Sequence, residues 1–177
     1  MDWSSVVFYV IVFCALYVQI FFLYYFISKR RTLKEESTYN YKQEDLPGVT
    51  LVIACWNESS TIDATMVSVK NLEYPKDKIH TILVDDGSTD NTWAILQKYK
   101  DWKNTTILTK GNGGKHTALN FALPHVQTEL MCSIDADTFL EPDSLAKANA
   151  YFLRKPELSA VGGGVLIHKP STFAQKA

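Results

Sequence analysis

The hydrophobic residues of this chain follow two different patterns. From Val6 to Ile27 almost every residue is apolar, with Gln19 as the main exception. A helix of about 20 apolar residues is long enough to span the hydrocarbon core of a bilayer. We therefore predict a transmembrane helix over residues 5–28. A helix buried in the core of a soluble protein is the alternative.

The residues that flank this apolar run indicate its orientation. Lys29, Arg30 and Arg31 follow it at once, whereas Asp2 precedes it without any Lys or Arg. Basic residues favour the cytoplasmic side of a membrane, and a secretory signal peptide would have a basic start and a shorter apolar stretch. We predict a single-pass protein of the cell membrane, with a juxtamembrane linker over 29–48 and a cytoplasmic domain over 49–177.

Beyond the linker, short apolar runs alternate with amphipathic stretches. The apolar runs predict strands over 49–56, 79–86, 105–109, 129–135 and 158–168. The amphipathic stretches predict helices over 61–71, 89–100, 114–123 and 141–155. Such alternation with short connections indicates βαβ units, and hence an α/β fold with a mostly parallel sheet flanked by helices.

Polar side chains follow four of the predicted strands. In doubly wound sheets, ligands bind outside the carboxyl ends of the strands, so these residues are the candidates for a site. The candidates are Asn57, Glu58, Asp85, Asp86, Lys115, Asp135 and Asp137.

Asp135 and Asp137 are two residues apart, so in an extended backbone their side chains point to the same side. Two neighbouring carboxylates repel unless a cation or a proton lies between them. Because Mg²⁺ typically binds one or two carboxylates together with phosphate oxygens, the pair fits a metal–diphosphate site. Two solvated acids in a polar loop are the alternative.

Two further stretches could contact a nucleotide. In "VDDGSTDNT" (84–92) a carboxylate could accept hydrogen bonds from a nucleobase or a sugar, although turn formation and helix capping also explain the stretch. "KGNGGKHTALN" (110–120) could bring backbone N–H groups and Lys115 close to phosphate. The second stretch is neither a Walker A loop nor a dinucleotide fingerprint, because His116 stands where each motif requires another residue.

Charge and cysteine content narrow the function classes. The formal net charge of −1 gives no reason to expect nucleic acid as a partner. The three cysteines, Cys14, Cys55 and Cys132, lie in apolar runs at no metal-ligand spacing. An odd number without obvious pairs argues against a disulfide framework and agrees with a cytoplasmic domain.

Four stretches, taken in order, resemble the family 2 glycosyltransferases, which are inverting enzymes of the GT-A fold. They are "ACWNES", "VDDGSTDNT", "KGNGGKHTALN" and "DADTFLEPDSL", and the resemblance covers about residues 48–168. The last two most resemble the processive membrane synthases of poly-N-acetylglucosamine, chitin oligosaccharides and hyaluronan. The resemblance implies transfer from a UDP-sugar, with UDP-N-acetylglucosamine expected, to a growing polysaccharide or oligosaccharide acceptor.

The resemblance also implies roles for the candidate residues. Asp135 and Asp137 would form the DxD motif of the family, which holds Mg²⁺ or Mn²⁺ on the UDP diphosphate. Asp85 and Asp86 would contact the uridine, and Lys115 would lie near the nucleotide or its phosphates. The strand end before Asn57 and Glu58 would line the nucleotide pocket, and Asn57, Glu58 and Asp135 would belong to the donor site.

No catalytic base is assigned within this sequence, because the resemblance places the general base of the family beyond Ala177. We therefore expect the chain to be inactive alone, with a second chain as one source of the acceptor half. A nucleotide-sugar-binding module or partner subunit without chemistry is the first alternative. A haloacid-dehalogenase-like phosphatase, which also places a D-x-D after a buried strand, is the second.

Overall fold

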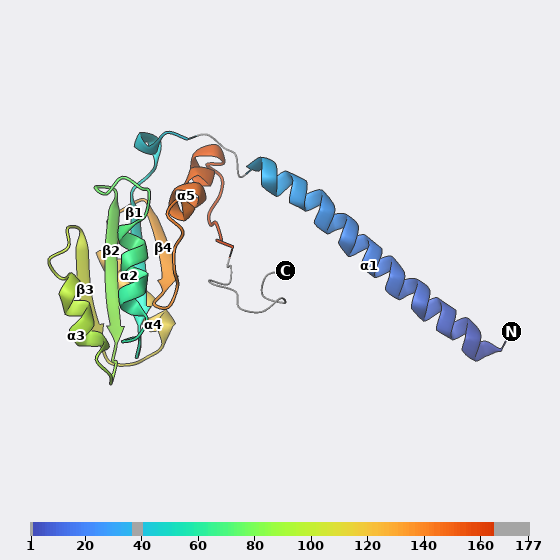
Figure 1. Ribbon diagram of the computed structural model, residues 1–177, viewed down its shortest axis with the longest axis horizontal. Helices are drawn as coiled ribbons and strands as arrows, with labels where there is room; N and C mark the ends of the chain where they lie inside the picture. Colours follow the sequence, from blue (N-terminus) through green and yellow to red (C-terminus); the bar gives the residue numbers. More distant parts are fainter. Residues whose placement is uncertain (1, 37–40, 165–177) are drawn as a thin grey trace. The chain divides into compact units, whose positions relative to one another are not determined.

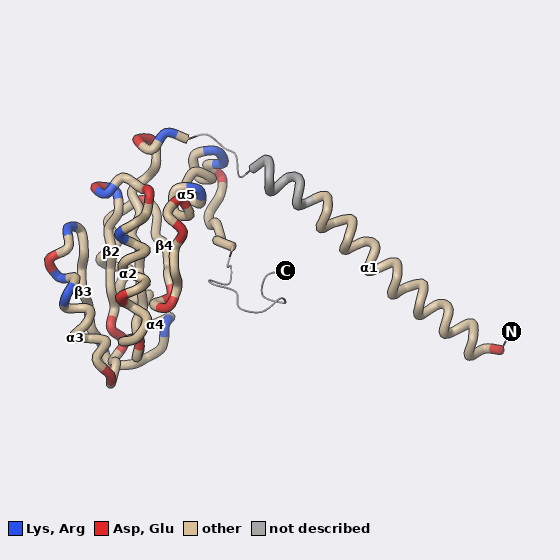
Figure 2. Tube along the Cα trace, in the orientation of Figure 1, with Lys and Arg blue, Asp and Glu red and all other residues tan. Residues whose placement is uncertain are grey.

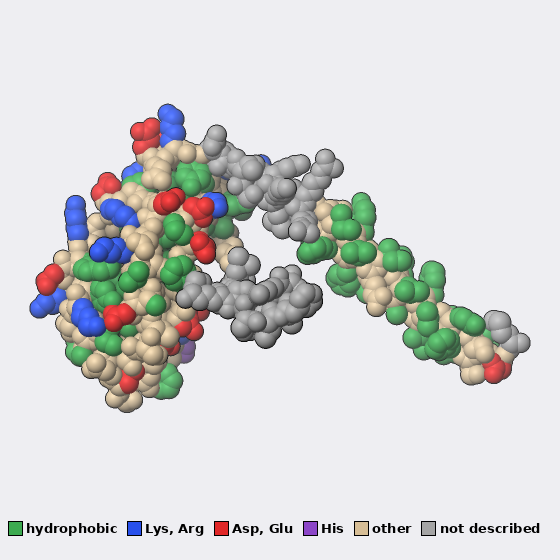
Figure 3. Space-filling view, viewed as in Figure 1, with side chains coloured by type: hydrophobic (Ala, Val, Ile, Leu, Met, Phe, Trp, Pro, Cys, Tyr) green, Lys and Arg blue, Asp and Glu red, His purple; other side chains and the backbone are tan. Residues whose placement is uncertain are grey.

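The computed structural model describes residues 2–36 and 41–164, and the chain divides into two compact units, Met1–Asn40 and Tyr41–Ala177. In the first unit a single helix, α1, spans Trp3–Glu36. It therefore continues past Ser28 into the segment expected to be a linker. Hydrophobic side chains are exposed along it (Figure 3), and its stretch Trp3–Ser28 is long and apolar enough to cross a membrane.

The second unit contains a sheet of four parallel strands in the order β3-β2-β1-β4 (Figure 1). The strands are β1 (Val49–Cys55), β2 (Ile79–Asp86), β3 (Thr105–Lys110) and β4 (Leu130–Asp135). Cys55 pairs with Asp85, Ala54 with Asp135, and Asp86 with Lys110. This register brings the carboxyl ends of all four strands to one edge of the sheet.

Helices cover both faces of the sheet. The helices are α2 (Ile62–Lys70), α3 (Thr92–Leu96), α4 (Lys115–Ala122) and α5 (Ser144–Arg154), and single 3₁₀ turns lie at Gln43–Asp45, Gln97–Tyr99 and Leu123–His125. Residues of α2, α3 and α5 share one core cluster, whereas α4 contributes to a separate one, so α4 lies on the opposite face.

Alternation along the strands explains the two clusters. In β1, Leu51 and Ile53 face the side of α2, α3 and α5, whereas Val52 faces α4 together with Ile82 and Val84 of β2. Successive side chains of a strand point to opposite faces. The central strands β1 and β2 are buried on both faces and contain long apolar runs, as is typical of parallel sheets. The edge strands β3 and β4 are more exposed, and β3 is largely polar.

The predicted parallel α/β fold is confirmed, with each of the first four predicted strands present. The prediction of a fifth strand over 158–168 is wrong for residues 158–164, which form no strand, and its last residues lie outside the described part of the chain. The three glycines at 162–164 weaken any strand there, because glycine has low strand propensity and no side chain to bury.

Candidate functional site

A pocket of about 410 Å³ lies at the carboxyl ends of the strands. It is near the boundary between β1 and β4, where the chain changes direction across the sheet, and such switch points are the usual ligand sites of doubly wound sheets. The pocket is lined by Ala54, Cys55, Trp56, Glu58, Asp86, Asn112, Gly114, Lys115, Asp135, Ala136 and Asp137. Five of the seven candidate residues, drawn from four segments of the chain, therefore meet there.

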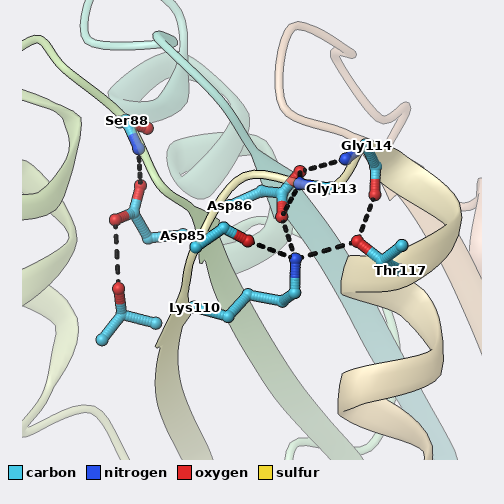
Figure 4. A network of polar contacts seen from close by, with 9 residues as sticks. Asp85, Asp86, Ser88, Lys110, Gly113, Gly114 and Thr117 are labelled. Atoms are coloured by element: carbon cyan, nitrogen blue, oxygen red, sulfur yellow. Dashed lines mark hydrogen bonds and ion pairs between the residues drawn. The ribbon is translucent and has the colours of Figure 1, made fainter.

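Asp86 holds the glycine-rich segment in place (Figure 4). Its Oδ1 accepts from Lys110 Nζ at 2.5 Å, and its Oδ2 accepts from the backbone N–H of Gly114 at 2.8 Å. Gly113 N also donates to this carboxylate, at 3.2 Å. Burial raises the pKa of Asp86, but the bonds and charge of Lys110 and the two backbone donors outweigh burial and hold the pKa below its usual value.

Lys110 extends this network to the first turn of α4. Its Nζ also donates to the carbonyl of Gly111 at 2.5 Å and to Thr117 Oγ1 at 2.8 Å. Thr117 Oγ1 in turn donates to the carbonyl of Gly114 at 2.8 Å. The glycine-rich segment is thus fixed at both ends, with Lys110 between the sheet and the helix.

Gly87 makes the close approach of two loops possible. Its φ is +71°, and a Cβ added there would lie 2.6 Å from the backbone nitrogen of Asn112. Only glycine adopts this φ without strain and leaves room for the facing backbone. The turn after β2 therefore abuts the glycine-rich segment directly.

Asp85 and Asn57 are near the pocket but do not line it. Asp85 is buried, and it accepts from Ser88 N at 3.2 Å and from Thr109 Oγ1 at 3.3 Å. Asn57, at a φ of 58°, accepts from Thr89 N at 2.8 Å. Both side chains organise the loops after β1 and β2, and their predicted contacts with a nucleotide stay predictions.

Glu58 lines the pocket and also supports the start of α2. Its Oε2 accepts from Thr61 Oγ1 at 2.5 Å, and its backbone N–H donates to Thr92 Oγ1 at 2.8 Å. The second bond ties the loop after β1 to the start of α3. Glu58 is thus held by neighbours on two elements while its carboxylate borders the pocket.

Asp135, Asp137 and Lys115 form the charged side of the pocket. Lys115 Nζ makes an ion pair with Asp135 Oδ1, and 52% and 57% of the two side chains are exposed. Asp137 is exposed and makes no hydrogen bond or ion pair with the described residues. The carboxylate of Asp137 is therefore open to a ligand or an ion from the solvent, whereas that of Asp135 is partly exposed but paired with Lys115.

The donor set fits a hard divalent cation. Among residues 2–36 and 41–164 no three His, Cys, Asp or Glu side chains are placed to hold a metal together. Two carboxylates nevertheless suffice for Mg²⁺-type binding when phosphate oxygens and water complete the coordination. The ammonium group of Lys115 on Asp135 shows that a cation fits beside this carboxylate. Acidic residues also gather at the carboxyl ends of β2 and β4 in Figure 2.

Trp56 and Cys55 also line the pocket, at the strand end expected there, although neither was singled out as a candidate residue. Trp56 is 54% exposed although it directly follows a buried strand, and that position in "ACWNES" was the available signal. Cys55 is buried, and burial together with the nearby carboxylates of Asp85 and Glu58 raises the pKa of its thiol to about 12. The thiol is therefore protonated at neutral pH and is a poor nucleophile.

The sequence of this chain is similar to a known protein family and to known proteins. Residues 50–177 match the family Glycosyl transferase family 2. The poly-beta-1,6-N-acetyl-D-glucosamine synthase of Staphylococcus epidermidis is 32% identical over 168 residues, which cover 93% of this chain and 40% of that protein. The synthase of the same name from Staphylococcus aureus is 31% identical over the same shares. The chain thus spans about 40% of the length of these relatives.

Solved structures share the fold. A mannosyltransferase from Pyrobaculum calidifontis in complex with GDP-Man and Mn²⁺ is similar with a TM-score of 0.61 and 27% identity, over 74% of this chain and 39% of that one. TarS 1-349 of S. aureus in complex with UDP-GlcNAc is similar with a TM-score of 0.56 and 26% identity, over 60% of this chain and 31% of that one. The sheet and its flanking helices therefore have the GT-A-like arrangement that the four sequence stretches implied.

Proposed function

Since this chain belongs to glycosyltransferase family 2, we propose that its pocket binds the nucleotide-sugar donor of an inverting glycosyl transfer. Because the chain belongs to this family, the alternative of a haloacid-dehalogenase-like phosphatase is rejected. The transfer would be a direct displacement at the anomeric carbon, in which an acceptor hydroxyl attacks with the help of a general base. No described residue is assigned the role of that base, so the proposal concerns the donor side of the reaction.

One observation carries the proposal: Asp135 and Asp137 border the same pocket as Lys115. Lys110 balances the charge of Asp86. The three other carboxylates of the pocket, those of Glu58, Asp135 and Asp137, face a single ammonium group, that of Lys115. A diphosphate is itself an anion and would be repelled from such a surface. A divalent cation between the diphosphate and the two aspartates removes this conflict, and we assign Asp135 and Asp137 as its ligands. The metal, Mg²⁺ or Mn²⁺, supplies charge stabilisation for the departing diphosphate.

We propose UDP-N-acetylglucosamine as the donor and a polysaccharide or oligosaccharide as the acceptor. The printed names of the staphylococcal synthases and the UDP-GlcNAc complex of TarS support this choice. Asp86, Glu58 and Lys115 would contact the nucleotide from the pocket wall, and Asp85 and Asn57 would shape the loops around it. A second chain that supplies acceptor-side residues is part of the same proposal.

Competition binding tests the donor. Labelled UDP-N-acetylglucosamine is bound to the full chain in detergent with Mn²⁺, and UDP, UMP and GDP are compared as competitors. We expect UDP to displace the label at least about tenfold better than UMP, because only UDP presents two phosphates to the metal. We expect GDP to compete less well than UDP. Equal competition by all three would contradict a site for a uridine diphosphate.

A transfer assay separates the enzyme from the binding module. Purified chain is incubated with labelled UDP-N-acetylglucosamine and N-acetylglucosamine oligomers, with a matched Asp137→Asn variant as the control. Elongation by the wild type that is lost in the variant would establish transferase activity of this chain alone. Donor binding without elongation would favour the binding module or partner subunit.

We further propose that α1 anchors the protein in the cell membrane as a single pass, with the second unit on the cytoplasmic side. The length and apolar composition of Trp3–Ser28 and the basic residues that follow support this proposal. The full chain should stay in the membrane pellet after alkaline carbonate extraction, whereas a variant without residues 2–28 should be released. Release of the full chain would contradict a membrane span.

A further inference from the structure

Lys115 forms an ion pair with Asp135, one of the two aspartates that we assign as ligands of the metal. Lys115 is the first residue of α4, and Asp135 is the last residue of β4. Their ion pair joins two elements that the sequence separates by 20 residues, inside the pocket that both residues line. The cation position at Asp135 is therefore already filled by a side chain of the protein.

This ion pair is suited to exchange. More than half of each side chain is exposed, and ion pairs so open to water contribute little to stability. The ammonium group of lysine sits on a flexible four-carbon stem, so it can leave the carboxylate without a backbone movement. The neighbouring pair of Lys110 and Asp86 differs, because its side chains are only 19% and 3% exposed and Lys110 makes two further contacts, with Gly111 and Thr117.

A divalent cation and the ammonium group of Lys115 would compete for Asp135. Two cations on the same carboxylate repel each other. Asp137 has no partner among the described residues, so its carboxylate is available to the metal as a second ligand, whereas Lys115 contacts Asp135. Once displaced, the ammonium group would stay at the pocket wall, where the diphosphate brings new negative charge. Lysine is a suitable point charge for phosphate.

We propose that Lys115 is the counter-ion of Asp135 when no metal is bound. The metal ion displaces the ammonium group of Lys115 from Asp135, and this ammonium group then binds the diphosphate of the donor. The proposal rests on the proposed donor site and adds a positioning role for one side chain. It makes metal and nucleotide binding cooperative: the metal frees Lys115 for the diphosphate, and the diphosphate draws Lys115 away from the metal ligand.

Metal binding without nucleotide tests the exchange. Mn²⁺ binding to the full chain in detergent is measured from the electron paramagnetic resonance of free Mn²⁺, for the wild type, Lys115→Met and Lys98→Met. Lys98 is the matched control, because its ion pair with Asp63 is exposed to a similar degree, 58% and 50%, but lies outside the pocket. We expect Lys115→Met to bind Mn²⁺ about fivefold more tightly than the wild type, which is the size of an interaction between unit charges about 4 Å apart in water. Lys98→Met should match the wild type.

UDP binding at saturating Mn²⁺, measured by calorimetry on the same proteins, tests the second half of the exchange. Lys115→Met should bind UDP about fivefold more weakly than the wild type, because the lysine no longer reaches the diphosphate. Lys115→Arg keeps the charge and should restore the wild-type order in both measurements. The melting temperatures of all variants should agree, since the substituted side chains are exposed.

The outcomes separate the exchange from the proposed function. Unchanged or weaker Mn²⁺ binding by Lys115→Met would overturn the exchange, and so would unchanged UDP binding, while metal-dependent UDP binding by the wild type would still support the donor site. A wild type that binds neither Mn²⁺ nor UDP would overturn the donor site and the exchange with it.

Discussion

Lys110 and Asp86 are paired twice, once through the backbone register of β3 and β2 and once through an ion pair of 2.5 Å between Nζ and Oδ1. Only 3% of the Asp86 side chain is exposed. The same carboxylate accepts hydrogen bonds from the backbone of Gly113 and Gly114. One charged pair at the end of two strands thus fixes the position of the glycine-rich segment that borders the pocket.

The first prediction concerns loss of this pair. Lys110→Met removes the partner of a buried carboxylate, and breaking a buried ion pair on one side costs about 3 kcal/mol. We expect the free energy of unfolding in urea to fall by about that amount. Lys98→Met, which breaks an exposed pair, should lower it by less than about 1 kcal/mol. Equal effects of the two substitutions would show that the Asp86 network does not hold the fold.

The second prediction concerns the pH dependence of stability. Burial raises the pKa of Asp86 in the folded chain, but the contacts with Lys110, Gly113 and Gly114 outweigh burial and hold this pKa below its ordinary value. The unfolded chain therefore binds a proton at this residue at a higher pH than the folded chain. Its stabilisation is fully present above about pH 5 and is lost as the pH falls through the folded pKa.

Urea unfolding of the wild type and Asp86→Asn between about pH 7 and pH 3 measures this contribution. The two free energies of unfolding should differ most at neutral pH, and the difference should shrink toward the acid end. A constant difference between the wild type and Asp86→Asn would argue against a lowered pKa.

The third prediction concerns the contact between the two loops at Gly87. Gly87→Ala places a Cβ at a φ of +71° and 2.6 Å from Asn112 N, and we expect a loss of about 2 kcal/mol in the free energy of unfolding. UDP binding should weaken as well, because the displaced segment borders the pocket. Gly111→Ala is the matched control, since nothing lies within 4 Å of its added Cβ. Similar losses for the two variants would refute the steric explanation.

The sheet could be predicted from the sequence mainly because its central strands β1 and β2 are buried on both faces and contain continuous apolar runs. The segment 158–164 has the same composition apart from its glycines, yet the structure pairs it with no strand of the described sheet. The local sequence pattern shows only that a segment is apolar, whereas strand pairing depends on partner strands far away in the sequence. The prediction of a strand at 158–164 failed because the local sequence does not show whether a partner strand is within reach.

The candidate site shows a similar division. That polar residues meet at the strand ends follows from parallel topology, and Glu58, Asp86, Lys115, Asp135 and Asp137 do line one pocket. The difference between Asp85 and Asp86 depends on which face α4 covers, and the role of Lys110 depends on the register of β2 and β3. Neither is contained in the local sequence, because both arise from contacts between separate elements.

The most direct test of the central claim is a calorimetric titration of UDP into the full chain in detergent, with and without Mn²⁺, for the wild type and for Asp135→Asn/Asp137→Asn. We expect Mn²⁺ to tighten UDP binding by the wild type at least about tenfold and to have no such effect on the variant. The variant should keep the wild-type melting temperature, since both side chains are exposed. Mn²⁺-dependent binding that survives in the variant, or UDP binding indifferent to Mn²⁺ in the wild type, would contradict a metal–diphosphate site at these two aspartates.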